Sequence, residues 1–357
     1  MFSHRKLVVP ALAVLGLLAG PGAAMAHDGG ALYTQTNDPA GNVVQAFDRA
    51  DDGTLTPAGA YPTGGAGLAS LGGRQGAVEL SDSERTVYAV NAGADTVTAF
   101  RVEHGQLVRR AVVDSGGVAP TSVDAQDGRV YVLNSGGVPN VTAFAARHGR
   151  LRRLGSQDLP GALGAAQVSV APDGRRLVVT ERLSNRLETI AVDRSGRLGA
   201  PVTTASSGTV PFGFAFGRDE QIVVSEAGAS TVSSYRVGDG LSVITASLAV
   251  GPGAACWVAV SPDGRWAYTG NASGSISGFA VARDGSLTAL TPGGPTALVT
   301  APRDLDFSRD GRFLYVVSPG NATAPAQVTG FQVGRDGALT RITAAPALAG
   351  LTGAAGA

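Results

Sequence analysis

One unit recurs seven times along the 357-residue chain, and its period constrains the fold more than any single residue does. Each copy reads as an apolar strand, an Asp-Gly turn, a second apolar strand, a polar loop, a third strand and another turn; residues 258–287 and 305–339 show it most clearly. The third strand of each copy carries one large apolar marker: Phe47, Phe100, Phe144, Ile190, Tyr235, Phe279 and Phe331. Successive markers lie 44 to 53 residues apart, and a period near 45 with several short strands is typical of a β-propeller blade. The sequence therefore predicts an all-β fold, a seven-bladed β-propeller with four-stranded antiparallel blades.

The first unit is incomplete, which predicts how the ring closes. Residues 32–35 resemble a second strand and residues 42–48 a third strand, but no inner strand precedes them. We expect residues 351–357 to supply that inner strand, so that N- and C-terminal segments share one blade. Such closure removes two unpaired strand edges that would otherwise favour aggregation.

The first 26 residues have the composition of a secretory signal peptide. His4-Arg5-Lys6 is a charged start, residues 7–20 are apolar, and Ala24-Met25-Ala26 is a cleavage triplet. We expect cleavage after Ala26 and export, to the extracellular space or the cell envelope; the alternative is a retained membrane anchor. Residues 27–357 are then a single propeller domain. No later segment has the ~18 apolar residues of a membrane helix, so no membrane insertion is expected.

Charge and cysteine content exclude several classes of protein. The 28 basic and 28 acidic residues balance, which argues against nucleic acid as a partner. Cys256 is the only cysteine, so no internal disulfide can form. A buried apolar thiol is favoured over a reactive nucleophile at this position. A monomer is expected.

Polar residues follow the second strand of six units, on the face opposite the Asp-Gly turns. They are Asn91, Asn134, Glu181, Glu226, Asn271 and Ser318. The starts of the inner strands add Ser122, Gln167, Trp257, Arg303 and Asp304. Variable loops on a rigid scaffold are where function concentrates, so this ring predicts a site for a small polar ligand at the channel mouth. Alternatively, the Asn and Ser residues cap loops, Glu181 pairs with Arg182 or Arg186, and Trp257 packs in the core.

The histidines lie away from this mouth. His104 and His148 fall in turns on the other face, so no histidine is available there as a general base. A metal site built on His or Cys is excluded by the same reasoning. No cofactor is expected, although an oxygen-ligand site for Ca²⁺ or Mg²⁺ in the channel stays open.

The repeats resemble a known family. Segments such as VAVSPDGRWAYTGN followed by ISGFAVARDGSL, and LDFSRDGRFLYVVSPG followed by VTGFQVGRDGAL, are similar to the seven-bladed lactonases. That family includes propeller-type 6-phosphogluconolactonases and carboxymuconate lactonising enzymes, and the resemblance covers residues 31–357. It implies a lactone or lactone-forming acid at the channel mouth, no required metal, and catalysis by His, Glu and Arg side chains.

The chain departs from that pattern where the family has a Pro-His pair. Ala165-Ala166-Gln167 and Ala255-Cys256-Trp257 stand there instead, so the channel histidine is missing. Two hypotheses follow. In the first, Arg182 or Arg303 polarises a lactone carbonyl and Glu181 or Glu226 is the general base on water. In the second, the same mouth holds a small ligand or a protein of the cell envelope without turnover.

Overall fold

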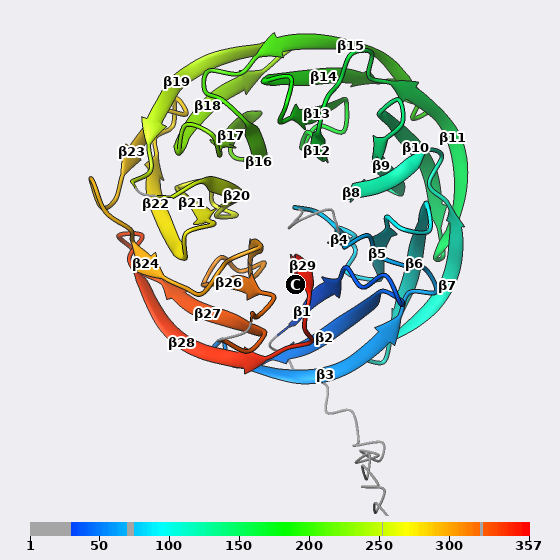
Figure 1. Ribbon diagram of the computed structural model, residues 1–357, viewed down its shortest axis with the longest axis horizontal. Helices are drawn as coiled ribbons and strands as arrows, with labels where there is room; N and C mark the ends of the chain where they lie inside the picture. The colour runs from blue at the N-terminus through cyan, green and yellow to red at the C-terminus, as the bar shows by residue number, and fades with distance from the viewer. Residues whose placement is uncertain (1–29, 70–74, 252, 322–323) are drawn as a thin grey trace, which may run out of the picture.

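The fold is a closed ring of β-sheets around a central channel (Figure 1). The computed structural model describes residues 30–69, 75–251, 253–321 and 324–357. Within these ranges all regular secondary structure is β-strand, and the strands form seven antiparallel sheets. The predicted seven-bladed propeller is confirmed.

Each blade runs from an inner strand at the axis to an outer strand at the rim. Blade 1 contains β29 (Leu351–Gly356), β1 (Ala31–Thr36), β2 (Val43–Arg49) and β3 (Leu55–Pro62). Blade 2 contains β4 (Val78–Leu80), β5 (Thr86–Asn91), β6 (Thr96–Glu103) and β7 (Gln106–Asp114). Blade 3 contains β8 (Val118–Gln126), β9 (Arg129–Gly136), β10 (Asn140–Arg147) and β11 (Arg150–Asp158). Blade 4 contains β12 (Ala165–Val170), β13 (Arg176–Glu181), β14 (Arg186–Val192) and β15 (Leu198–Ala205).

The last three blades repeat this order. Blade 5 contains β16 (Pro211–Phe216), β17 (Gln221–Glu226), β18 (Thr231–Val237) and β19 (Leu241–Ala249). Blade 6 contains β20 (Ala255–Val260), β21 (Trp266–Asn271), β22 (Ser275–Val281) and β23 (Leu287–Ala289), and the short β24 (Ala297–Leu298) also pairs with β22. Blade 7 contains β25 (Asp304–Phe307), β26 (Phe313–Ser318), β27 (Gln327–Val333) and β28 (Leu339–Pro346).

The ring closes through blade 1, as the incomplete first unit predicts. The C-terminal strand β29 lies innermost and pairs antiparallel with β1, from Leu32 opposite Gly356 to Thr36 opposite Leu351 (Figure 1). The amide of Ala357 donates to the carbonyl of Ala31 at 2.8 Å. The two ends of the described chain are therefore fastened by a backbone ladder.

Apolar side chains fill the spaces between neighbouring blades. Because strand side chains point to the two faces of a sheet, each blade packs both faces against its neighbours. The described residues form seven buried clusters, one at each of the seven blade interfaces. All seven third-strand markers are at most 2% exposed. The repeat spacing of large apolar residues thus specifies the inter-blade core.

The predicted signal peptide, residues 1–26, lies outside the described residues. Within the described part of the chain, no helix is long and apolar enough to cross a membrane.

Removal of residues 348–357 should destabilise the whole ring, because it deletes β29 and leaves the inner edge of β1 unpaired. Leu351→Ala should give a graded version of this effect. Leu351 is fully buried, and truncation of a buried Leu costs about 2–5 kcal/mol. Thermal unfolding with size-exclusion chromatography measures both effects. Leu348→Ala is the control, since Leu348 is 36% exposed. A truncated ring that unfolds at the parent temperature would contradict the prediction.

Candidate functional site

The blade geometry decides which residues can reach the axis. The side chains of the second and third strands point into the inter-blade faces, and only the inner strands and the loops border the channel. A central cavity of about 280 Å³ is lined by residues from all seven inner strands or the residues directly before them. Gln167 and Asp304, two of the predicted site residues, are among them.

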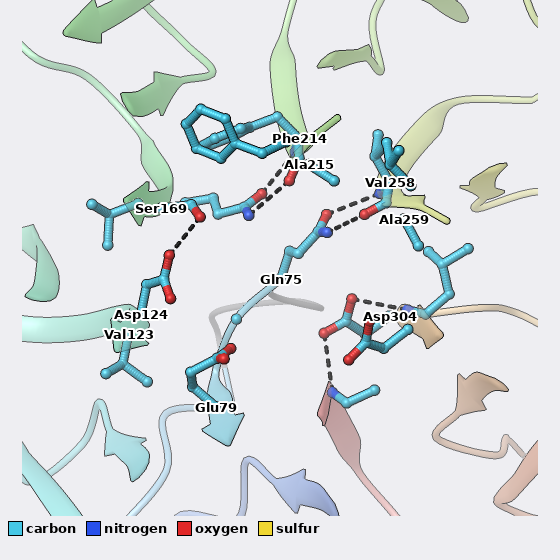
Figure 2. A pocket seen from close by; sticks show the side chains of 18 of the residues that line it. Gln75, Glu79, Val123, Asp124, Ser169, Phe214, Ala215, Val258, Ala259 and Asp304 are labelled. Atoms are coloured by element: carbon cyan, nitrogen blue, oxygen red, sulfur yellow. Dashed lines mark hydrogen bonds between the residues drawn. The ribbon is translucent and has the colours of Figure 1, made fainter. Parts of the chain in front are cut away.

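Side-chain amides join inner strands of different blades (Figure 2). Gln167 on β12 accepts from the amide of Phe214 on β16 at 2.7 Å and donates to its carbonyl at 2.9 Å. Gln75, just before β4, makes the same pair of bonds with Val258 on β20, across the channel. Each glutamine thereby satisfies backbone groups that an inner strand leaves unpaired. Gly213 leaves room for Gln75, because a Cβ there would lie 2.1 Å from its side-chain oxygen.

Four carboxyl groups border the same cavity, namely Glu79, Asp124, Asp304 and Asp306. Burial raises the pKa of all four, to about 6 for Asp306. Hydrogen bonds from backbone amides act in the opposite direction and lower the pKa of Asp124, Asp304 and Asp306. Asp304 accepts from the amide of Ala354, and Asp306 accepts from that of Gly356, so both hold the closing strand β29. Among the described residues, no group of three or more His, Cys, Asp or Glu side chains could hold a metal ion.

The channel mouth is shaped by a recurring irregularity at the start of the inner strands. In blades 3, 4, 5 and 6 the register to the second strand shifts there. A left-handed residue precedes each shift: Ala119, Gly164, Val210 and Ala254, with φ between 49° and 67°. For a β-branched residue such as Val210 this conformation is strained. β-Bulges of this kind re-aim side chains, and the residues that the register skips include Phe212 and Cys256.

Five residues form what we call the mouth cluster: Arg182, Phe212, Cys256, Trp257 and Arg303. The Arg182 guanidinium lies 5.1 Å from the centre of the Phe212 ring, and the Arg303 guanidinium lies 5.7 Å from that of Trp257. The two rings meet edge to face, with their centres 5.8 Å apart. Three sequence-predicted site residues, Arg182, Trp257 and Arg303, are therefore brought together. Trp257 is also 2% exposed and belongs to the core between blades 6 and 7, which is the packing role left open as the alternative.

The mouth cluster has unused hydrogen-bonding capacity. Arg182 donates to the carbonyl of Gly164 at 3.3 Å, and Arg303 donates to that of Pro302 at 3.2 Å. Neither guanidinium forms an ion pair with a carboxylate of the described residues, so most of their N–H donors are available. The Trp257 indole N–H is buried and has no partner among the described residues. Desolvation lowers the pKa of Arg182, as expected for a cation without a counter-ion.

Cys256 is a protonated thiol in this setting. It is 8% exposed, and its Sγ–H donates to the carbonyl of Ala254 at 3.3 Å. Burial raises its pKa to about 11, although Arg303 and Arg182 act in the opposite direction. The thiol therefore does not act as a thiolate nucleophile near neutral pH.

Glu181 and Glu226 lie elsewhere. Both are fully buried at the ends of β13 and β17, and neither lines the central cavity. Glu181 accepts from Arg186 at 2.5 Å and from Ser184 at 2.6 Å, while its other oxygen has no hydrogen-bond partner in the part of the chain that the structure describes. The structure thus gives Glu181 the Arg186 pairing that the sequence left as an alternative.

Glu226 is held by neutral donors. Its Oε1 accepts from the amide of Gly208 at 2.7 Å and from Ser233 at 2.6 Å, and its Oε2 accepts from Thr231 at 2.5 Å. Gly208 belongs to the connection between blades 4 and 5, so the carboxylate anchors that crossover. The two glutamates are therefore not brought together with Gln167, Trp257 and Asp304, because second-strand side chains point into blade faces rather than toward the axis.

The remaining ring residues follow the same rule. Asn91, Asn134, Asn271 and Ser318 are all fully buried. Asn91 donates to Thr98 and accepts from Thr63, and Asn134 donates to the carbonyl of Ser115. Asn271 donates to Ser277 at 2.9 Å. The contacts of the three asparagines run to the third strand or to the preceding crossover, which is the loop-capping role left open as the alternative, whereas the Ser318 hydroxyl has no partner among the described residues.

The family comparison agrees with this architecture. Residues 41–159 and 139–247 match the family described as "Lactonase, 7-bladed beta-propeller", together more than half of the chain. The chain belongs to this lactonase family. No curated protein has a significantly similar sequence.

Solved structures share the fold of this lactonase-family propeller at low identity. A Bacteroides fragilis protein provisionally assigned as a 6-phosphogluconolactonase superposes with a TM-score of 0.75 at 18% identity, covering 94% of this chain and 99% of that one. The periplasmic gluconolactonase PpgL of Pseudomonas aeruginosa gives a TM-score of 0.71 at 18% identity, covering 91% and 98%. A Lactobacillus plantarum protein gives 0.72 at 18% identity, covering 91% and 98%.

Several residues of the channel and the mouth cluster were not predicted from the sequence. Phe212, Gln75, Glu79, Asp124 and Asp306 border the mouth or the channel. Phe212 holds the position in β16 that Cys256 holds in β20, so aligning the bulged strand starts could have found it. The channel carboxylates lie at alternate positions of inner strands, a signal visible in the Asp304-Leu305-Asp306 triplet.

Asp306 should make stability fall as pH rises. Its folded pKa of about 6 lies above the ordinary value of 3.8, so the folded state binds the extra proton between these values. Its contribution, on the order of 3 kcal/mol, is fully present below about pH 4 and is lost as pH rises through about 6. Urea unfolding from pH 4 to 7.5 should show a shallower decline for Asp306→Asn than for the parent. Equal slopes would refute the assignment.

Proposed function

We propose that this protein binds and hydrolyses a small lactone at the channel mouth, with Arg182 and Arg303 as the groups that hold the reacting carbonyl. The observation that carries the proposal is the pair of partly buried guanidinium groups beside aromatic rings, with no carboxylate partner among the described residues. Membership of the lactonase family and the likeness to PpgL support the same reaction class.

The chemistry is the addition of water to an ester. Water attacks the lactone carbonyl carbon, negative charge develops on the carbonyl oxygen, and the ring C–O bond then breaks to give a hydroxy acid. A guanidinium aimed at that oxygen stabilises the charge more in the transition state than in the ground state. The product carboxylate suits the planar fork of an arginine, which binds it through two N–H donors.

The ring of the substrate would lie against the half-buried Phe212, whose ring meets that of Trp257 edge to face. Trp257 itself is 2% exposed and packs in the core between blades 6 and 7. Its indole N–H has no partner among the described residues. A compact lactone with a polar carbonyl end and an apolar ring face is complementary to this surface.

The attacking nucleophile is water rather than Cys256, because the thiol has a pKa of about 11. The predicted bases Glu181 and Glu226 are fully buried and do not border the mouth cluster, so a role of either in taking the proton from that water rests on the sequence prediction alone. Glu181→Gln and Glu226→Gln test it, since each swap keeps the volume and removes the base. Their unfolding temperatures must be measured beside the rates, because both carboxylates are buried hydrogen-bond acceptors.

Binding without turnover is the second candidate function. The mouth cluster contains no carboxylate or histidine, so it can hold a carboxylate or lactone without a neighbouring base. Ligand affinity that depends on Arg182 and Arg303, with no acid release from any lactone, would establish this function. A monomeric, cofactor-free protein is proposed in either case.

We also propose export to the cell envelope or beyond, on the basis of the charged start, the apolar run and the Ala24-Met25-Ala26 triplet. The name of PpgL places that structural neighbour in the periplasm, which is consistent with the proposal.

Arg182→Gln and Arg303→Gln should each lower kcat/KM for lactone hydrolysis by about 10²-fold or more, since loss of one oxyanion donor typically costs ~3–4 kcal/mol of transition-state stabilisation. Acid release from sugar and aromatic lactones at pH 7 measures the effect. Arg152→Gln is the control, because it removes the same charge from an exposed position on β11. Activity that survives both substitutions would rule out the proposed roles.

The exported protein should begin at His27. Intact mass measurement and N-terminal sequencing of protein recovered outside the cytoplasm of the producing cell test this. A species that retains Met1, or protein found only in the cytoplasm, would refute the export proposal.

A further inference from the structure

A second cavity of about 240 Å³ lies between blades 2 and 3, among the Asp-Gly turns and therefore on the face opposite the mouth cluster. It is bordered by the turn of blade 2 at residues 81–86, the hairpin of blade 3 at residues 125–129 and the outer turn of blade 3 at residues 146–149. We call it the inter-blade cavity. None of its lining residues takes part in the lactone site proposed above.

An unusually short hairpin helps to open this cavity. In blade 3, Gln126 pairs directly with Arg129, so Asp127 and Gly128 alone make the turn, with φ of 49° and 72°. Both values are typical of a type I′ hairpin. The corresponding turn of blade 4 is longer and is closed by the amide of Ala171 and the carbonyl of Arg176.

The small side chain of Thr86 also helps to open the inter-blade cavity. Thr86 pairs with the residue that follows a third-strand marker, a position that Trp266 and Phe313 occupy in blades 6 and 7. In those blades the nearby hydroxyls of Tyr268 and Tyr315 donate to glycine carbonyls of the next outer turn, at 2.8 Å each.

Tyr88 is the blade 2 counterpart of these tyrosines. Its hydroxyl forms no hydrogen bond with the outer turn at residues 147–149, all of which are described. The space filled by a ring in blades 6 and 7 is therefore lined by hydroxyl groups in blade 2.

The lining is rich in arginine. Arg101, Arg129 and Arg147 border the cavity together with His148 and two carboxylates, Asp82 and Asp127. Arg129 donates to the carbonyl of Arg194. The side chains of Arg101 and Arg147, which lie on β6 and β10, form no ion pair and no hydrogen bond with any residue in the described part of the chain. Asp82 already accepts the amide of Asp127 at 3.2 Å, so it is drawn toward the hairpin.

We propose that the inter-blade cavity binds a tetrahedral oxyanion, either free phosphate or the phosphate group of a larger molecule. Such an anion accepts hydrogen bonds on all sides, and the cavity offers guanidinium groups from two blades together with the hydroxyls of Thr86 and Tyr88. Binding there joins the turns of neighbouring blades through charge-assisted hydrogen bonds. The site is independent of lactone hydrolysis.

Isothermal titration of the mature protein at low ionic strength, with inorganic phosphate and with phenyl phosphate as probes, tests the proposal. One saturable site is expected, and Arg101→Gln and Arg147→Gln should each weaken it by about tenfold or more, since hydrogen bonds to charged groups contribute about 1.5–3 kcal/mol. Tighter binding of phenyl phosphate than of inorganic phosphate would identify a phosphorylated molecule as the ligand, and the reverse would identify the free ion.

Two further variants separate this site from unspecific attraction. Thr86→Trp, which copies Trp266, should fill the cavity and abolish binding, and its unfolding temperature shows whether the blade is intact. Arg152→Gln removes an exposed arginine outside the cavity and should leave affinity unchanged. The proposal is overturned by the absence of saturable binding, or by an Arg152→Gln effect as large as that of Arg101→Gln.

Discussion

The ring depends on satisfying the backbone groups that the inner strands turn toward the channel. Each inner strand pairs with a second strand on one side only, and a buried N–H or C=O without a partner is costly. Here glutamine and aspartate side chains reach from one inner strand to another, as Gln167 does to Phe214 and Asp306 to Gly356. Carboxyl groups consequently stand in the channel although burial raises their pKa. Structural hydrogen bonds between inner strands therefore occupy part of the channel, which is not only a space for ligand.

Above this layer, the mouth combines irregular backbone with charged and aromatic side chains. The left-handed residues before the inner strands cost conformational energy, and Val210 is the clearest case. Their repetition in several blades indicates that the surrounding sheets impose them. The consequence is local: the register skips Phe212 and Cys256, so that Phe212 packs against the Arg182 guanidinium and Cys256 packs with Trp257 in the core between blades 6 and 7. The stability of the blades thus offsets the conformational cost of the left-handed residues before the inner strands.

Periodic features of the sequence were sufficient to predict the fold. The seven markers predicted seven blades, and the incomplete first unit predicted the pairing of residues 351–357 with β1. The site was predicted only in part, because period alone does not say which face of a strand a residue occupies. Glu181 and Glu226 were placed at the mouth from their strand position, yet they point between blades, where hydroxyl, amide and guanidinium donors surround them. Gln75 could not be foreseen, since its contact with Val258 joins residues far apart in the chain.

The closing ladder also bears on how the chain could be rearranged. Ala31 and Ala357 are hydrogen-bonded neighbours, although they stand at opposite ends of the described chain. A short linker between them would make blade 1 a continuous four-stranded unit, and the chain could be opened at another crossover between blades. Every strand pairing would survive this circular permutation, while a covalent bond would replace the non-covalent fastening of the ring. Circular permutation would move the chain ends but would leave the order of the blades around the axis unchanged.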